Sequence, residues 1–69
     1  MINEIYKKPT IAEVHVVVEK ANKKREKFGI SIVELSKKLE VNYSNLTRVL
    51  NGGLINYQIV NKLYKWINE

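Results

Sequence analysis

The sequence lacks cysteine, and it has a single histidine, proline and tryptophan among 69 residues. Without cysteine there are neither disulfides nor thiolate metal sites, and the lone His15 gives little support to a metal site. The longest uninterrupted apolar run, Val16–Val18, is far too short for a membrane span, and no signal peptide is visible. We therefore expect a cytoplasmic protein with no metal and no cofactor.

A catalytic pattern is also missing, because the carboxylates are scattered and no nucleophile stands beside a base. We expect no enzyme activity. Lysine and arginine number 12 against 7 acidic residues, which gives a net charge of +5. Such a charge suits a polyanionic partner, although it also serves solubility alone.

Length limits the chain to a single domain, 1–69, which buries only about 60% of its unfolded surface and has modest stability. After a lead-in over 1–9, the capping box of Thr10 and Glu13 predicts a helix over 10–28. Its expected buried stripe, at helical spacing, is Ile11, Val14, Val18, Ala21, Arg25 and Phe28.

The run Val14–Val18 is rich in β-branched residues and alternates with His15, so it also suits a strand. We favour a helix, because the cap and the long stripe agree with each other. Gly29 then ends this helix, since glycine readily takes positive φ.

Two short helices joined by a tight turn are predicted over 31–51. Ser31 and Glu34 form a second capping box, Glu40-Val41 makes the turn, and Asn42 caps the second helix, 43–51. The expected inward residues are Ile32, Leu35, Leu39, Leu46, Val49 and Leu50.

A last helix is predicted over 57–68 with Asn56 as its cap, and its apolar residues cover more than one face. The face expected to pack on the core carries Val60, Tyr64 and Ile67. The residues partly off that face are Ile59, Leu63 and Trp66. A small domain cannot easily bury both faces, so we predict that this second set joins a homodimer; simple core filling is the alternative.

The fold class is therefore all-α, with four short helices, or five if Leu54-Ile55 forms a turn. If the apolar residues of helix 43–51 face the core, polar side chains lie opposite them. Two short helices joined by a tight turn have the layout of a helix-turn-helix, whose second helix enters the DNA major groove. Arg48 suits a bidentate contact with guanine, and the Thr47 methyl can meet a thymine methyl. The residues expected to read DNA bases are Tyr43, Ser44, Thr47 and Arg48. The alternative is an idle, solvated helix face.

The segment GISIVELSKKLEVNYSNLTRVLNG, residues 29–52, resembles without a gap the helix-turn-helix of the phage repressor and Cro family, also called XRE. The matching positions are Gly29, Ser31, Glu34, Leu35, Lys38, Leu39, Val41, Ser44, Leu46, Arg48, Val49 and Gly52. The resemblance implies a lambda-repressor-like domain from a phage or mobile element, with helix 43–51 in the major groove of double-stranded DNA. It implies the same four base-reading residues.

The expected phosphate contacts are Ser31, Lys37, Asn42 and Asn51. A homodimer would place two recognition helices about 34 Å apart on a pseudo-palindromic operator. The combined prediction is sequence-specific DNA binding by a small transcriptional regulator, a Cro-like repressor.

Three positions depart from the family pattern. Ile32 replaces a phosphate-binding glutamine, Ser36 replaces an alanine between the helices, and Glu40 replaces a turn glycine. A left-handed Glu40 costs on the order of 1 kcal/mol. Ile32 beside Val33 suits a protein surface better than a phosphate backbone. The alternative function is thus a protein-interaction module, an anti-repressor or antitoxin, with a regulatory protein partner.

The segment Lys20–Lys27 holds five basic residues among eight. It is either a solvated helix end whose cations favour the helix dipole or a region that attracts DNA. Arg25, on the apolar stripe, either pairs with a carboxylate or contacts a phosphate. Lys7 and Lys8 suit a minor-groove arm, although short basic termini are common.

Overall fold

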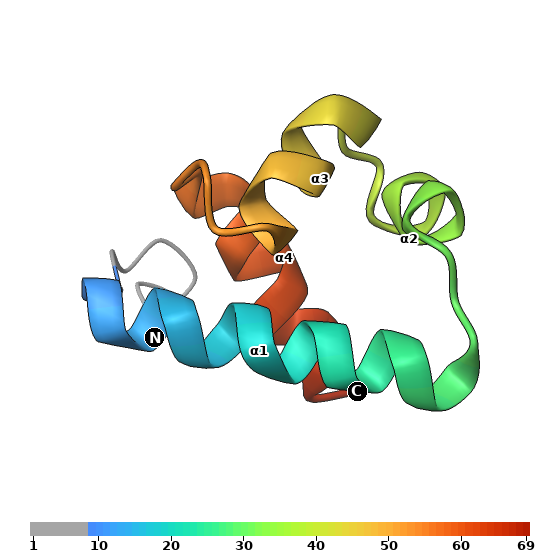
Figure 1. The fold of residues 1–69 in the computed structure, drawn as a ribbon, viewed down its shortest axis with the longest axis horizontal. Helices are drawn as coiled ribbons and strands as arrows, with labels where there is room; N and C mark the ends of the chain where they lie inside the picture. Colours follow the sequence, from blue (N-terminus) through green and yellow to red (C-terminus); the bar gives the residue numbers. More distant parts are fainter. Residues whose placement is uncertain (1–8) are drawn as a thin grey trace.

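Residues 9–69 are described by the computed structural model, and they form four α-helices and no strand (Figure 1). The helices are α1 (Ile11–Phe28), α2 (Ile32–Leu39), α3 (Tyr43–Leu50) and α4 (Tyr57–Ile67). This confirms the all-α fold class with four helices, since Leu54 and Ile55 are not helical. The proposed arm at Lys7 and Lys8 lies outside the described residues.

The N-terminus of α1 is closed by the predicted capping box. The Thr10 hydroxyl accepts a hydrogen bond from the Glu13 backbone N–H at 3.1 Å, and the Glu13 carboxylate accepts from the Thr10 N–H at 2.8 Å. Gly29 ends the helix at φ 68°. The helix prediction for Val14–Val18 is confirmed, because local caps and the burial of Val14 and Val17 outweigh the weak helix preference of β-branched residues.

The buried face of α1 is shorter than the predicted stripe. It consists of Val14, Val17 and Ala21. Ile11 and Phe28, at the two ends, are 56% and 60% exposed, so their predicted burial is wrong. The 18 residues of α1 span roughly 27 Å, whereas the 11 of α4 span roughly 16 Å. The ends of α1 therefore extend past the helix that covers its middle.

The predicted division of α4 into a core face and a dimer face is also wrong. The three residues assigned to the dimer, Ile59, Leu63 and Trp66, are all at most 4% exposed within the single chain. Tyr64, expected in the core, is 57% exposed. The reason is that α4 packs against both α1 and α3, so a wide arc of its surface is covered and no exposed trio remains for a second copy.

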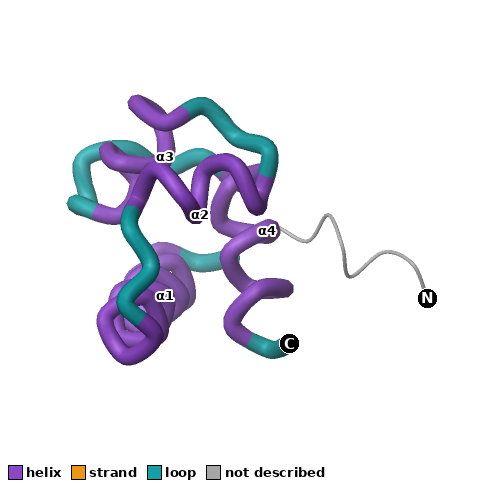
Figure 2. Tube along the Cα trace, turned by 90° about the vertical axis from the view of Figure 1, so that its right-hand side faces the viewer, coloured by secondary structure: helices purple, strands orange, loops and turns teal. Residues whose placement is uncertain are grey.

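The core lies where the four helices meet. In two perpendicular views α2 and α3 lie on the same side of α1, with α4 packed beside α1 (Figures 1 and 2). The largest fully buried side chains are Trp66, Leu35, Leu46, Leu63, Val49 and Val60. No helix within residues 9–69 combines the length and the hydrophobicity that crossing a membrane requires.

Side chains from α1 and α4 also close the ends of the two short helices. The Asn22 side-chain amide donates to the Leu50 carbonyl oxygen at 3.1 Å, at the C-terminus of α3. The Lys62 ammonium donates to the Leu39 carbonyl oxygen at 3.1 Å, at the C-terminus of α2. The last carbonyl groups of a helix have no partner inside it, so these contacts satisfy them and fix α2 and α3 on the other two helices.

Candidate nucleic-acid interface

The turn between α2 and α3 is built around Glu40, which is left-handed at φ 58° and ψ 50°. The Glu40 backbone N–H donates to the Lys37 carbonyl at 3.3 Å, and the Val41 N–H donates to the Ser36 carbonyl at 3.0 Å. Glu40 thus has the left-handed conformation that favours glycine. This turn allows α3 to begin three residues after Glu40 and to pack against α2.

Small and apolar side chains hold α3 against α2. Leu35 of α2 and Leu46 of α3 are fully buried. Ser36 is also buried, and its hydroxyl donates to the Val33 carbonyl at 2.7 Å. Because its one polar group is bonded inside α2, Ser36 packs as a small residue without a buried unpaired donor.

The outward face of α3 carries the four residues predicted to read bases. Tyr43, Ser44 and Arg48 are exposed, and Thr47 is half-buried. The side chains of Ser44 and Arg48 form no hydrogen bond or ion pair within residues 9–69. The Thr47 hydroxyl, by contrast, donates to the Tyr43 carbonyl at 2.9 Å. The predicted residues thus share one helix face, although one of them is engaged within that helix.

The four residues predicted to contact phosphate lie near the ends of α2 and α3. Ser31 and Asn42 are the N-caps, and each side chain accepts a hydrogen bond from a backbone N–H at 3.1 Å. Lys37 lies in the last turn of α2, and Asn51 follows α3. All four are exposed, so their remaining polar groups face solvent.

The first turn of α2 divides its two apolar residues between the core and the solvent. Ile32 is half-buried and packs against the core, while Val33 is 47% exposed. Val33, and not Ile32, is therefore the apolar residue that this turn presents. The N–H group of Glu34 is bonded to the Ser31 hydroxyl, and the N–H groups before it have no helical partner.

Two cations of the basic segment in α1 serve the fold. The Lys24 ammonium donates to the Trp66 carbonyl at 2.6 Å and lies 4.6 Å from the centroid of the Trp66 ring. The Arg25 guanidinium donates to the Ile30 carbonyl at 3.3 Å, and its Nε is buried without a partner within residues 9–69. The partner of Arg25 is a backbone carbonyl and not the expected carboxylate.

Lys20, an exposed lysine of this segment, does not extend the α3 face. Asn22 points from α1 toward α3, as its bond to Leu50 shows. Lys20 lies two positions before Asn22, about 200° around a helix with 3.6 residues per turn, so it points to the opposite side of α1. Lys23 forms a surface ion pair with Glu19 at 3.7 Å, which contributes little to stability.

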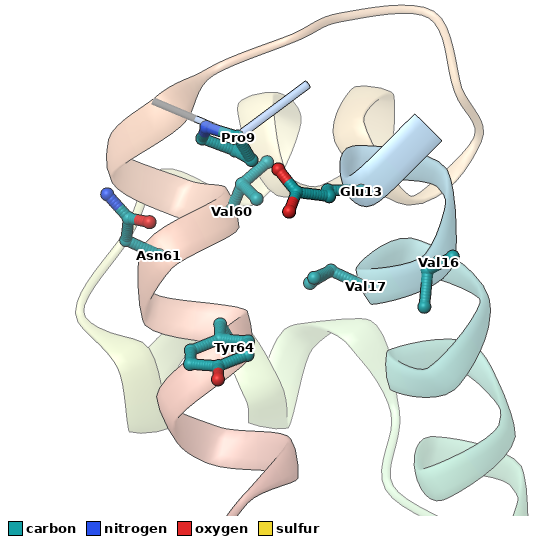
Figure 3. A pocket seen from close by; sticks show the side chains of 7 residues that line it. All are labelled: Pro9, Glu13, Val16, Val17, Val60, Asn61 and Tyr64. Carbon is teal, nitrogen blue, oxygen red and sulfur yellow. The ribbon is translucent and has the colours of Figure 1, made fainter. Parts of the chain in front are cut away.

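A groove between α1 and α4 lies apart from the residues predicted to contact DNA. It has a volume of about 340 Å³ and exposes Val16 and Tyr64 along its rim (Figure 3). Its lining consists of Pro9, Glu13, Val16, Val17, Val60, Asn61 and Tyr64.

Comparisons of the chain with protein-family models, with curated proteins and with solved structures found no match.

Proposed function

We propose that this protein is a small transcriptional regulator, a Cro-like repressor, that binds double-stranded DNA sequence-specifically. The observation that carries the proposal is the outward face of α3, where Arg48 and Ser44 are exposed and free of partners within residues 9–69. The opposite face of α3 is anchored by Leu46 and Val49 in the core. The major groove of B-DNA, about 12 Å wide, admits one helix presented in this way.

In this proposal α3 supplies the base contacts. Arg48 donates two hydrogen bonds to O6 and N7 of a guanine, the most frequent specific contact in the major groove. Ser44 bonds a second base, and Tyr43, in the first turn of α3, reaches a base edge or a phosphate. Thr47 completes the base-reading set.

The helix ends supply the phosphate contacts, which set the position of the protein along the duplex. We assign them to Ser31, Lys37, Asn42 and Asn51. The Ile32 side chain cannot donate a hydrogen bond to a phosphate. We propose that the free backbone N–H groups at the start of α2 donate to the phosphate instead. Such groups favour anions by their direction and by the helix dipole.

A homodimer on a pseudo-palindromic operator belongs to the same proposal. The eight residues of α3 span roughly 12 Å, which covers about four base pairs at 3.4 Å each. One copy therefore reads too few bases for specific binding in a genome. With Ile59, Leu63 and Trp66 buried, the exposed pair Val16 and Tyr64 provides apolar surface for a second copy. Because a regulator of this kind must reach DNA, we propose that the protein is located in the cytoplasm.

The test is a titration of the full chain with random duplex DNA and with DNA from upstream of its own gene, across a series of salt concentrations. We expect binding to both at low salt, a steep loss as salt rises, and tighter binding to the upstream duplex. Absence of binding to either duplex at low salt would overturn the proposal.

A second candidate function is that of a protein-interaction module, an anti-repressor or antitoxin. The exposure of Val33 at the start of α2 favours it, because an apolar side chain there faces a phosphate backbone poorly. Val33→Lys separates the two functions. The added cation should strengthen DNA binding if α2 approaches phosphates, whereas it should weaken a complex with a protein partner.

A further inference from the structure

The two hydroxyl residues on the outward face of α3 are not equivalent. The Thr47 hydroxyl donates its hydrogen to the Tyr43 carbonyl oxygen, at 2.9 Å. The Ser44 hydroxyl has no partner within residues 9–69. A hydroxyl carries one hydrogen and two acceptor lone pairs, so Ser44 keeps both functions and Thr47 keeps only that of an acceptor.

This internal bond restricts which bases Thr47 can recognise. Guanine presents only acceptors in the major groove, at N7 and O6, and thymine O4 is an acceptor as well. Thr47 cannot donate to them while its hydrogen is held by Tyr43. The bond also turns one branch of the Thr47 β-carbon toward the helix backbone. The methyl group, on the other branch, takes no part in this bond.

We propose that Thr47 determines specificity through its methyl group and selects the thymine of an A·T base pair. The inference rests on the proposed function, in which α3 enters the major groove. Thymine alone among the four bases presents a methyl group there. The paired adenine presents an N6–H donor, which suits the acceptor lone pair that Thr47 retains. Both free groups of Thr47 thus match the same base pair.

The neighbouring Arg48 prefers a different base from the one that we assign to Thr47. Its guanidinium has only donors and suits guanine, whereas the free groups of Thr47 are a methyl and an acceptor. Adjacent positions of α3 therefore carry complementary preferences. Thr47 is half-buried, so part of its side chain stays accessible to a ligand on the outward face of α3.

Two variants separate the methyl group from the hydroxyl. Thr47→Val keeps the shape and the methyl and removes the hydroxyl, while Thr47→Ser keeps the hydroxyl and removes the methyl. The wild-type protein and both variants are used to select sites from a pool of random duplexes. The preferred site is then synthesised with thymine or with deoxyuridine, which lacks only the methyl, at each thymine in turn. Helix content measured by circular dichroism checks that the three proteins fold alike.

We expect deoxyuridine at one position to weaken binding of the wild type and of Thr47→Val about fourfold, the effect of withdrawing one methyl group from water. Thr47→Ser should bind the thymine and deoxyuridine sites equally. If Thr47→Ser keeps the discrimination and Thr47→Val loses it, the hydroxyl reads the base and the inference is wrong. It is also wrong if a selected site shows no deoxyuridine effect, although the proposed function then stands. If the wild type selects no site and binds no duplex, the proposed function itself fails, and this inference fails with it.

Discussion

The long helices α1 and α4 and the short helices α2 and α3 depend on different interactions. The long pair contributes Trp66, the largest buried side chain. The short helices have eight residues each, against 18 in α1 and 11 in α4, and of the four only α1 exceeds the roughly 12–15 residues that an isolated helix needs in water. The short helices are held by the core and by Asn22 and Lys62, which close their C-termini. The long pair is thus a scaffold. The candidate DNA-reading surface lies on helices that are stabilised by their contacts with this scaffold.

The largest expected effect lies in the scaffold. Trp66→Ala should lower the free energy of unfolding by about 3–5 kcal/mol, because it opens a cavity in the core and removes the ring beneath Lys24. A domain of this size has little stability to lose, so thermal denaturation followed by circular dichroism should show it mostly unfolded. The control is Tyr64→Ala on the same helix, which should change stability by no more than about 0.5 kcal/mol. An equal loss in both variants would contradict the observed division of α4.

The next effect concerns the short pair and DNA. Arg48→Ala should weaken binding to a selected site by about 1–3 kcal/mol without altering the melting temperature, because Arg48 has no partner in the fold. Lys20→Ala removes the same charge from the opposite side of α1, so it is the matched control. Fluorescence anisotropy with the selected duplex measures both. Equal losses would show that net charge, and not the α3 face, governs binding.

Substitutions at Gly29 and Glu40, the left-handed C-caps of α1 and α2, should change the free energy of unfolding in opposite directions. Gly29→Ala should destabilise the protein by about 1 kcal/mol and Glu40→Gly should stabilise it by about 1 kcal/mol, because only glycine takes this conformation without strain. A β-carbon at Gly29 would meet no atom within 4 Å, so crowding does not contribute. Chemical denaturation measures the separation of about 2 kcal/mol between the variants. Changes of the same sign would show that something other than backbone strain decides these turns.

The smallest expected effect concerns the hydrogen bond between Asn22 of α1 and Leu50 of α3, which joins the long pair to the short pair. Asn22→Ala should cost about 1 kcal/mol, because it leaves the Leu50 carbonyl without its donor. Hydrogen exchange should locate the loss at the C-terminal turn of α3. Asn61→Ala removes an amide from α4 that bonds nothing within residues 9–69, and it should leave α3 protected as before. A uniform loss of protection in Asn22→Ala would mean that the contact supports the whole fold and not α3 alone.

Local chemistry made much of the helix-turn-helix predictable. A capping box needs only two residues three positions apart, so Thr10 with Glu13 and Ser31 with Glu34 marked two helix starts from sequence alone. The outward face of α3 also followed from short spacings, whereas the turn position of Glu40 came from the resemblance of residues 29–52 to repressor helix-turn-helices. The hydrogen bond of Thr47 is equally local. A threonine hydroxyl in a helix either donates to the carbonyl four residues earlier or faces solvent, and the spacing of residues in the sequence does not show which of the two occurs.

The sequence by itself determined where the helices begin and end and which side of α3 is polar, because these depend on residues three or four positions apart. Only the tertiary structure decided which faces of α1 and α4 are covered. That outcome depends on relative helix lengths and on contacts between distant residues, such as Lys24 with Trp66 and Asn22 with Leu50. For this reason Ile59, Leu63 and Trp66, which a helical pattern left free for a partner, belong to the core of a single chain.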